Sequence, residues 1–473
     1  MIRILEIANG KLNQHLLNGA PEYKPESTSH LLIQPLSEDY LCITNSYLNK
    51  SFIMEREDWD EEGVYPAEFE QFIGYPSSPL QVIDLPDNLI EESAKTTTFV
   101  IALSYDCNLR CKYCYQQCDP HLDRRKMSAE NLTFVLDTIT AYQEKHPDKN
   151  IYIELFGGEP LLKENHDDVI RIFDYCVDHD YSIGITTNGV NIPYYLKDLV
   201  IYSGMGITIN TTIDSLSENE KTRFSSDTGV DSKGSSLLKS IYTLINYDIT
   251  VHVETNIDQH NIDQIGDMVK FYQENGFLGN PNFWFGIARV DDRRFETGYD
   301  KMVTDTQLVQ KLNELNITDP HVYYAFVKSI LTLCRKLDPG FRQMERKYIS
   351  NYCWASAPID NVYYIDSALD VFRCTFTVGR KDYSQFKFSL ENLENYKLPN
   401  RTYMDYEQCR NCKIGGFCSG GCAQSAEINF DRMCSAEKED FRNFLDTIYY
   451  PRVKTMLESY LAENTSEQKE LVS

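Results

Sequence analysis

The sequence lacks the features that would place the protein at a membrane, on nucleic acid or outside the cell. Its 473 residues contain no apolar run that approaches the ~20 residues of a membrane-spanning helix. Lys and Arg number 46 against 71 Asp and Glu, and the resulting net charge of −25 repels phosphate backbones and anionic lipid. The N-terminal segment MIRILEIANGKLNQHLL has neither a continuous apolar core nor a small-residue cleavage site. We therefore expect a cytoplasmic protein that binds neither nucleic acid nor membrane.

Cysteine, in contrast, is abundant and clustered. Of the 14 cysteines, three lie between positions 107 and 114 and five between positions 409 and 434. Because the chain shows no export signal, we expect its thiols to stay reduced rather than to form disulfides. Cys176 and Cys334 fall within helical apolar patterns and are expected in the core. The clustered cysteines indicate metal binding or catalysis.

A regular alternation of β-rich and helical segments runs from about Thr97 to about Val290. Ser128 is the expected N-cap of a helix over Ala129–Glu144, and Gly204 the expected C-cap of a later helix. Strands that alternate with helices form a parallel sheet, which is either an open barrel of six units or a doubly wound sheet. The six expected strands are Thr98–Ser104, Ile151–Phe156, Ser182–Thr187, Ile207–Ile213, Thr250–Asn256 and Phe283–Val290.

The expected fold class is α/β, with a parallel sheet of six (β/α) units at its centre. A small N-terminal α+β module and a Cys-rich C-terminal domain are expected to flank these units. The expected parts are an N-terminal module at 1–95, the (β/α) units at 96–300, a helical bridge at 301–350, the Cys-rich domain at 351–445, and a C-terminal helix with a frayed tail at 446–473.

The first cysteine group, Cys107-X3-Cys111-X2-Cys114, directly follows the first expected strand. The loops after parallel strands gather at one mouth of a barrel, where active sites are built. A [4Fe–4S] cluster takes four protein ligands, so three thiolates leave one iron open to bind something else. A zinc knuckle or a chance cluster is the alternative for these three residues alone.

Two further segments end the next two expected strands. Gly157-Gly158-Glu159-Pro160 follows the second, where paired glycines allow close backbone approach to a ligand. Thr186-Thr187-Asn188-Gly189 ends the third and supplies hydroxyl and amide groups suited to a ribose or carboxylate. A strand-end glycine pair alone is more often a simple turn, but three such features on consecutive strands reinforce one another.

These motifs together resemble the radical S-adenosylmethionine (SAM) enzymes. The resemblance implies that the six units form a partial (β/α)6 TIM-like barrel. The resemblance implies that Cys107, Cys111 and Cys114 hold a [4Fe–4S] cluster whose open iron is chelated by SAM. It implies that reductive cleavage of SAM yields a 5′-deoxyadenosyl radical, with the electron supplied by a donor such as flavodoxin or ferredoxin. The residues that it places against SAM are Tyr113 beside the adenine; Gly157, Gly158, Glu159 and Pro160 along the methionyl amine; and Thr186, Asn188, Thr212, Asp214 and Arg223 as further contacts.

The second cysteine group resembles the SPASM domain, which extends many peptide-modifying radical SAM enzymes and carries auxiliary clusters. A lone CX2C would more often bind zinc. The resemblance implies two additional [4Fe–4S] clusters, three in all. It assigns Cys409, Cys412, Cys418 and Cys434 to a distal cluster, and Cys353, Cys374 and Cys422 to a proximal cluster.

The chain departs from the SPASM pattern in three places. Leu369 stands where a glycine is expected, five residues before Cys374. No eighth cysteine occurs near Ile359, so the proximal cluster has an open iron or a ligand other than cysteine. Thr375, rather than an aspartate, follows Cys374, which argues against the sulfatase-maturing branch.

An open auxiliary iron could bind the thiolate of a substrate cysteine and hold its sulfur near a carbon radical. We therefore expect a maturase of a ribosomally made precursor peptide that forms a thioether crosslink from cysteine. The precursor is expected to contain cysteine and to carry a leader. The alternatives are carbon–carbon crosslinking, epimerisation or sulfatase-type side-chain oxidation, auxiliary clusters that only stabilise the fold or conduct electrons, and, outside enzymes, a zinc-stapled interaction protein. The N-terminal module is expected to be either a leader-binding winged helix or a capping hairpin with a linker.

Overall fold

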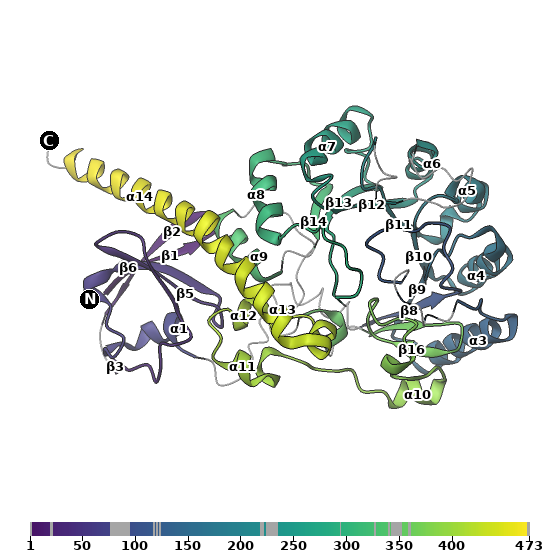
Figure 1. Cartoon of the computed structure of the whole chain (residues 1–473), viewed down its shortest axis with the longest axis horizontal. Coiled ribbons are helices and arrows are strands. Elements are labelled where there is room, and N and C mark those ends of the chain that lie inside the picture. Colours follow the sequence, from purple (N-terminus) through teal and green to yellow (C-terminus); the bar gives the residue numbers. More distant parts are fainter. Residues whose placement is uncertain are drawn as a thin grey trace.

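The computed structural model describes residues 2–18, 22–75, 95–116, 119, 122, 124–217, 222–223, 235–293, 295–325, 328–338, 341, 352–357 and 361–470. Ile359, near which the SPASM pattern allows an eighth cysteine, lies outside these residues. Figure 1 shows an N-terminal β-sheet, a large central sheet with helices around its outside, and a long C-terminal helix pair.

Ten strands form the central sheet, in the order β14-β13-β12-β11-β10-β9-β8-β15-β16-β17. The six expected strands are all present, with ends shifted by one or two residues: β8 (Thr96–Ala102), β9 (Asn150–Phe156), β10 (Ser182–Thr187), β11 (Ile207–Thr212), β12 (Thr250–Ile257) and β13 (Phe283–Arg289). They pair parallel to one another in chain order. A doubly wound sheet reverses its strand order at a switch point, so this unbroken order identifies the partial barrel.

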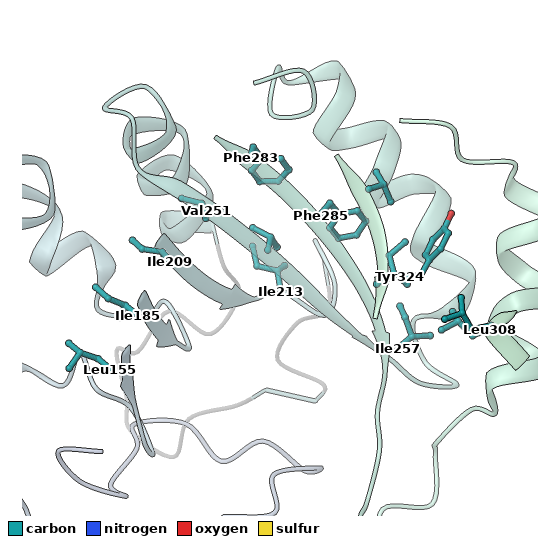
Figure 2. Packing of buried hydrophobic residues seen from close by; sticks show 14 of the residues in the cluster. Leu155, Ile185, Ile209, Ile213, Val251, Ile257, Phe283, Phe285, Leu308 and Tyr324 are labelled. Atoms are coloured by element: carbon teal, nitrogen blue, oxygen red, sulfur yellow. The ribbon is translucent and has the colours of Figure 1, made fainter. Parts of the chain in front are cut away.

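The helices cover one face of this sheet. They are α3 (Ala129–Lys145), α4 (His166–His179), α5 (Ile192–Ile201), α6 (Ser235–Ile245) and α7 (Ile265–Glu274), and they lie along the outside of the sheet (Figure 1). Buried side chains such as Leu155, Ile185, Val251 and Phe285 form the core of the barrel (Figure 2). Because strand side chains alternate, residues such as Glu154 point to the opposite, concave face.

Helix ends follow local chemistry, with one correction. Ser128 caps α3 as expected, and its hydroxyl accepts a 3.1 Å hydrogen bond from Asn131 N. The expectation for Gly204 is wrong, because α5 ends at Ile201 with Tyr202 as its C-cap. A short 3-10 turn follows, and Gly206, with φ of 75°, takes the left-handed position that ends it.

The sheet extends beyond the six expected strands. The segment expected to be a helical bridge holds α8 (Asp305–Leu315) and α9 (Lys328–Leu337), but between them β14 (Val322–Ala325) pairs with β13. On the other side, β15 (Asn361–Ile365) pairs parallel to β8, and β16 (Asp370–Phe372) and β17 (Phe386–Lys387) follow antiparallel. These strands are too short to show a period in the sequence; they form because each finds an open sheet edge.

Leu369 lies in the turn between β15 and β16 with a φ of 63°. This is the left-handed region that glycine adopts without steric cost, which explains why glycine is expected there. Asp366 holds the turn, because its carboxylate accepts hydrogen bonds from Ala368 N (2.9 Å) and Asp370 N (2.8 Å).

The N-terminal module is mainly β-structure. A five-stranded antiparallel sheet, in the order β2-β1-β6-β5-β4, comprises β1 (Ile2–Ala8), β2 (Lys11–Leu17), β4 (Leu32–Pro35), β5 (Tyr40–Asn45) and β6 (Lys50–Glu55), and β3 (Glu22–Tyr23) pairs with β7 (Tyr65–Pro66). Within residues 2–75 the described part of the chain holds a single α-helix, α1 (Glu70–Ile73). Asn9 and Gly10, with φ of 53° and 70°, close the unanticipated β1–β2 hairpin.

The C-terminal region consists of short helices followed by two long ones. The short ones are α10 (Leu390–Asn395), α11 (Glu407–Arg410) and α12 (Gly415–Cys418). Helix α13 (Ala423–Phe444) continues through a π-helical turn into α14 (Tyr450–Glu470), which reaches the N-terminal sheet (Figure 1). There the Tyr460 hydroxyl donates a 2.7 Å hydrogen bond to Gln14. Cys176 and Cys334 are buried, as expected, and among the described residues no helix is long and apolar enough to cross a membrane.

Candidate active site

The loop after β8 brings Cys107, Cys111 and Cys114 together. Burial raises the pKa of the Cys107 thiol to about 11 and that of Cys111 to about 12, and the neighbouring thiols also raise the pKa of each. Two donors point at the Cys107 sulfur, namely Leu109 N at 3.4 Å and Asn188 Nδ2 at 3.5 Å. These three partly buried, mutually interacting thiols, with two N–H donors at Cys107, form a donor set that suits an iron–sulfur cluster.

Gly157 and Gly158 clamp this cysteine loop. A Cβ on Gly157 would lie 2.3 Å from Ser104 O, and one on Gly158 would lie 2.2 Å from Asp106 O. Gly158 N donates to Ser104 O at 3.1 Å, and Glu159 N donates to Asp106 O at 2.8 Å. The sequence predicts that the backbone of these glycines approaches a ligand closely. Among the described residues, it approaches the backbone of Ser104 and Asp106, next to Cys107.

Glu159 is fully buried and ties the end of β9 to the end of β10. Its carboxylate accepts hydrogen bonds from Leu161 N (2.8 Å), the Thr187 hydroxyl (2.6 Å) and Asn188 N (2.6 Å). Burial raises the pKa of this carboxyl, and the three donors oppose that rise. The Glu159 side chain therefore holds the strand ends, and Pro160 continues the same turn, its carbonyl accepting from Asn165 Nδ2 at 3.1 Å.

Thr186 and Asn188 occupy the adjacent strand end. The Thr186 hydroxyl donates to Glu154 at 2.7 Å. Asn188 Nδ2 lies 2.7 Å from Asn108 Oδ1 as well as near Cys107, so this amide links β10 to the cysteine loop.

A buried polar cluster surrounds Tyr113. Its hydroxyl donates to Asp214 Oδ2 at 2.6 Å and accepts from Arg223 Nη1 at 3.2 Å and Asn256 Nδ2 at 3.3 Å. The Thr222 hydroxyl also donates to Asp214 Oδ2, at 2.9 Å. The predicted residues Tyr113, Asp214 and Arg223 therefore meet.

Two members of this cluster, Thr222 and Asn256, were not anticipated. The position of Asn256 near the end of the fifth strand was the available signal. Thr212, in contrast, makes no hydrogen bond through its side chain among the described residues.

Charge is concentrated beside the cysteine loop. Burial raises the pKa of Asp214, although Arg223 opposes that rise. Burial alone would lower the pKa of Arg223, but Tyr113, Cys111 and Asp214 outweigh it and keep the guanidinium charged. A fixed cation thus lies next to Cys111, where it favours the thiolate that a metal requires.

The later cysteines form two further groups. Burial raises the pKa of Cys374, and Cys353 and Cys422 raise it further. Burial raises the pKa of Cys409 to about 11, and Cys412 and Cys434 add to that effect.

Cys418 ends helix α12, directly after the loop that carries Cys409 and Cys412. Cys374 therefore lies near Cys353 and Cys422, and Cys409 lies near Cys412 and Cys434, as the two expected sets require.

The thiols do not converge on a point. In the described part of the chain, no three His, Cys, Asp or Glu side chains are placed to hold a single metal ion. Each thiolate of a four-iron cluster binds a different iron, so the ligands of such a cluster surround it and do not converge on one metal position. Within the described part of the chain, two buried donors have no hydrogen-bond partner: the Tyr406 hydroxyl and Gln424 Nε2. Tyr406 is close in sequence to Cys409, and Gln424 is close to Cys422. Sulfur acceptors would satisfy them, which fits auxiliary clusters.

The N-terminal module docks on the loop of the second cysteine region, a contact that sequence reasoning missed. The Tyr47 hydroxyl lies 2.8 Å from Cys409 O and 2.6 Å from Cys412 O. A Cβ on Gly416 would lie 2.1 Å from Ser46 O, so the two segments meet at backbone distance. No local sequence signal marks a contact between residues more than 360 positions apart.

Residues 101–272 match the family model of the radical SAM superfamily. The chain contains a radical SAM domain. This domain implies SAM and at least one [4Fe–4S] cluster, and the loop of Cys107, Cys111 and Cys114 offers a donor set that would suit such a cluster. The radical SAM cyclopropyl synthase TigE of Paramaledivibacter caminithermalis is 24% identical over 74% of this chain and 73% of its own length. The chain spans less of two further curated relatives, 57% and 51% of their lengths.

Solved structures share the fold of the radical SAM domain. The structure of anSMEcpe with bound AdoMet and Cp18Cys peptide covers 77% of this chain and 99% of its own, with 16% identity and a TM-score of 0.54. Streptococcus suis SuiB bound to precursor peptide SuiA covers 86% of this chain and 97% of its own, with 14% identity and a TM-score of 0.50. At these identities the likeness establishes the fold.

Proposed function

We propose that the protein is a maturase of a ribosomally made precursor peptide and forms a thioether between a cysteine sulfur and a carbon of that peptide. The observation that carries the proposal is the separate gathering of Cys353, Cys374 and Cys422, close to a radical SAM domain. Three thiols leave a fourth ligand position for the cysteine of a substrate.

The chain's own residues have distinct tasks in this proposal. Cys107, Cys111 and Cys114 hold the cluster that, with SAM bound, supplies the 5′-deoxyadenosyl radical. Gly157 and Gly158 fix the position of the cysteine loop, because a side chain at either residue would clash with the backbone of that loop. The remaining predicted residues, namely Tyr113, Thr186, Asn188, Thr212, Asp214 and Arg223, line the same mouth and contact SAM.

The two auxiliary clusters would be held by the remaining seven cysteines. Cys409, Cys412, Cys418 and Cys434 form a complete set for the distal cluster. Cys353, Cys374 and Cys422 form the proximal set and orient the substrate sulfur. Thr375 follows Cys374 and has no carboxylate to take a proton, which favours sulfur–carbon bond formation over sulfatase-type oxidation.

A peptide substrate is supported by the neighbours of the fold. SuiB, which shares it, was solved with a precursor peptide. We propose that the N-terminal module binds the leader of the precursor, because its sheet has edge strands β2 and β4 to which an extended segment could add. The contact of Tyr47 with the loop of Cys409 places that module beside the auxiliary region. A flavodoxin or ferredoxin would supply the electron.

A second candidate is carbon–carbon bond formation within a peptide. The match to a cyclopropyl synthase over 74% of this chain favours it. The two candidates differ in the fate of the substrate thiol, which a thioether consumes and a carbon–carbon bond leaves free.

The test combines the anaerobically purified full chain with SAM, a reductant and a cysteine-containing precursor peptide. The proposal predicts release of 5′-deoxyadenosine and a peptide that has lost two hydrogens and no longer reacts with iodoacetamide. Loss of two hydrogens with a reactive thiol would favour the carbon–carbon candidate. Zinc in the purified protein with no 5′-deoxyadenosine would contradict both and favour a zinc-stapled interaction protein. A Cys107→Ala variant is the control that must release no 5′-deoxyadenosine.

A further inference from the structure

The hydroxyl of Tyr406 is buried and has no hydrogen-bond partner among the residues that the structure describes. Its oxygen is shielded from solvent. A buried hydroxyl left unpaired costs about 1–3 kcal/mol, so native proteins rarely keep one without a use. The position of this hydroxyl therefore suggests an acceptor that the polypeptide does not provide.

The ring of Tyr406 is held firmly in place. The Arg401 guanidinium lies 4.7 Å above it, and the Phe430 ring lies 5.2 Å away. On another side, a Cβ on Gly420 would come within 3.2 Å of the Tyr406 ring. The hydroxyl is therefore aimed by packing, and Tyr406 has little freedom to turn it elsewhere.

Tyr406 lies between the two later cysteine groups. Its carbonyl accepts a 3.0 Å hydrogen bond from Cys409 N, in the proposed distal set. Its ring lies against Gly420, in the short loop that connects Cys418 of the distal set to Cys422 of the proximal set. Burial raises the pKa of Tyr406 to about 12, and the charges of both Cys409 and Cys422 contribute to that rise.

We propose that Tyr406 is a positioning residue whose hydroxyl donates a hydrogen bond to a sulfur of an auxiliary cluster and so tunes the reduction potential of that cluster. The inference rests on the proposed function, because it requires the auxiliary clusters. A hydrogen bond to a cluster sulfur stabilises the reduced, more negatively charged state, and thereby raises the potential. The cluster so tuned accepts an electron more readily than it would without Tyr406.

The chain offers a matched control in Tyr403. Its hydroxyl is also buried and without a partner, three residues earlier. Burial and Tyr75 raise the pKa of Tyr403, and no cysteine contributes. Its ring packs on Tyr47 at 5.1 Å, in one buried cluster with Cys409, whereas Gly420 in the loop before Cys422 faces the Tyr403 Cα and the Tyr406 ring.

The experiment compares the wild-type chain with Tyr406→Phe and Tyr403→Phe after anaerobic reconstitution. Iron and sulfide are counted, and the potential of each cluster is measured by redox titration followed by electron paramagnetic resonance. We expect about twelve irons in all three proteins. We expect a more negative potential for at least one auxiliary cluster in Tyr406→Phe, and unchanged potentials in Tyr403→Phe. In the reduced wild-type protein in D2O, an exchangeable deuteron coupled to that cluster should be present, and Tyr406→Phe should lack it.

The outcomes separate this inference from the proposal on which it rests. About four irons in the wild-type chain would overturn the auxiliary clusters and this inference together. About twelve irons with unchanged potentials in Tyr406→Phe would overturn the inference alone. Loss of iron in Tyr406→Phe, or an equal shift in Tyr403→Phe, would show a structural role and would also overturn it.

Discussion

Replacing Gly158 by alanine should damage the radical SAM site selectively. The new Cβ would lie 2.2 Å from Asp106 O and 2.4 Å from Tyr105 O, and contacts under 3.0 Å essentially do not occur. Both obstacles are backbone atoms, so no side chain can swing aside. The loop that carries Cys107 must therefore move by nearly an ångström. Overpacking of this kind costs about 1–3 kcal/mol of folding free energy.

The larger effect falls on chemistry, because displacement of a reactive group by ~1 Å costs about a hundredfold in rate. We expect Gly158→Ala to release 5′-deoxyadenosine at about one hundredth of the wild-type rate, and to bind fewer than the about twelve irons of the wild-type chain, because the displaced loop holds its cluster in only part of the molecules. The assays are iron content and chromatography of the products of SAM cleavage. Gly204→Ala is the control, because a Cβ there meets nothing within 4 Å and should change neither quantity. If Gly158→Ala kept the wild-type iron content and the wild-type rate of SAM cleavage, Gly158 would not be what holds the cysteine loop in position.

Three further predictions follow from the cysteine groups, the docked module and the β15–β16 turn. Cys107→Ala should abolish SAM cleavage, whereas Cys409→Ala should keep part of the cleavage and lose the peptide product; equal loss of both activities in Cys409→Ala would contradict separate roles. Tyr47→Phe leaves buried carbonyls of the Cys409 loop without their hydrogen-bond donor, at a cost of about 1–3 kcal/mol. A chelator should therefore remove iron faster from this variant than from the wild-type chain, and equal rates would count against the docking role. Burial raises the pKa of Asp366 to about 6 from 3.8, so the folded state binds this proton more tightly than the unfolded chain does, and the group lowers stability as pH rises through that interval. Asp366→Asn cannot ionise, so its free energy of unfolding relative to wild type, measured by chemical denaturation, should rise by about 1.4 kcal/mol between pH 5 and pH 8, and a pH-independent difference would contradict the assignment.

The parts of the fold that repeat a local pattern could be predicted from the sequence. The strands of the barrel alternate buried and open side chains, and the cap of α3 by Ser128 depends on residues three apart. The cysteine groups could be predicted for a related reason. Cys107, Cys111 and Cys114 lie within one loop, and Cys409 and Cys412 lie in another, so spacing alone brings them close.

Contacts between distant parts of the chain could not be predicted. The hydroxyl of Tyr47 meets the Cys409 loop across 362 positions, and nothing near Tyr47 in the sequence marks it. The pairing of β15 with β8 likewise joins two segments that are far apart in the sequence, and β15 is too short to show a strand pattern of its own. The paired glycines predict a close backbone approach, and in the structure Gly158 approaches the backbone of Asp106 and Tyr105.

The most direct test of the account is the metal content of the anaerobically purified and reconstituted chain, followed by treatment with SAM and a reductant. The account predicts about twelve irons with matching acid-labile sulfide, as in three four-iron clusters, and release of 5′-deoxyadenosine. About four irons with 5′-deoxyadenosine released would retain the radical SAM site and remove the auxiliary clusters. Zinc without 5′-deoxyadenosine would contradict the account as a whole.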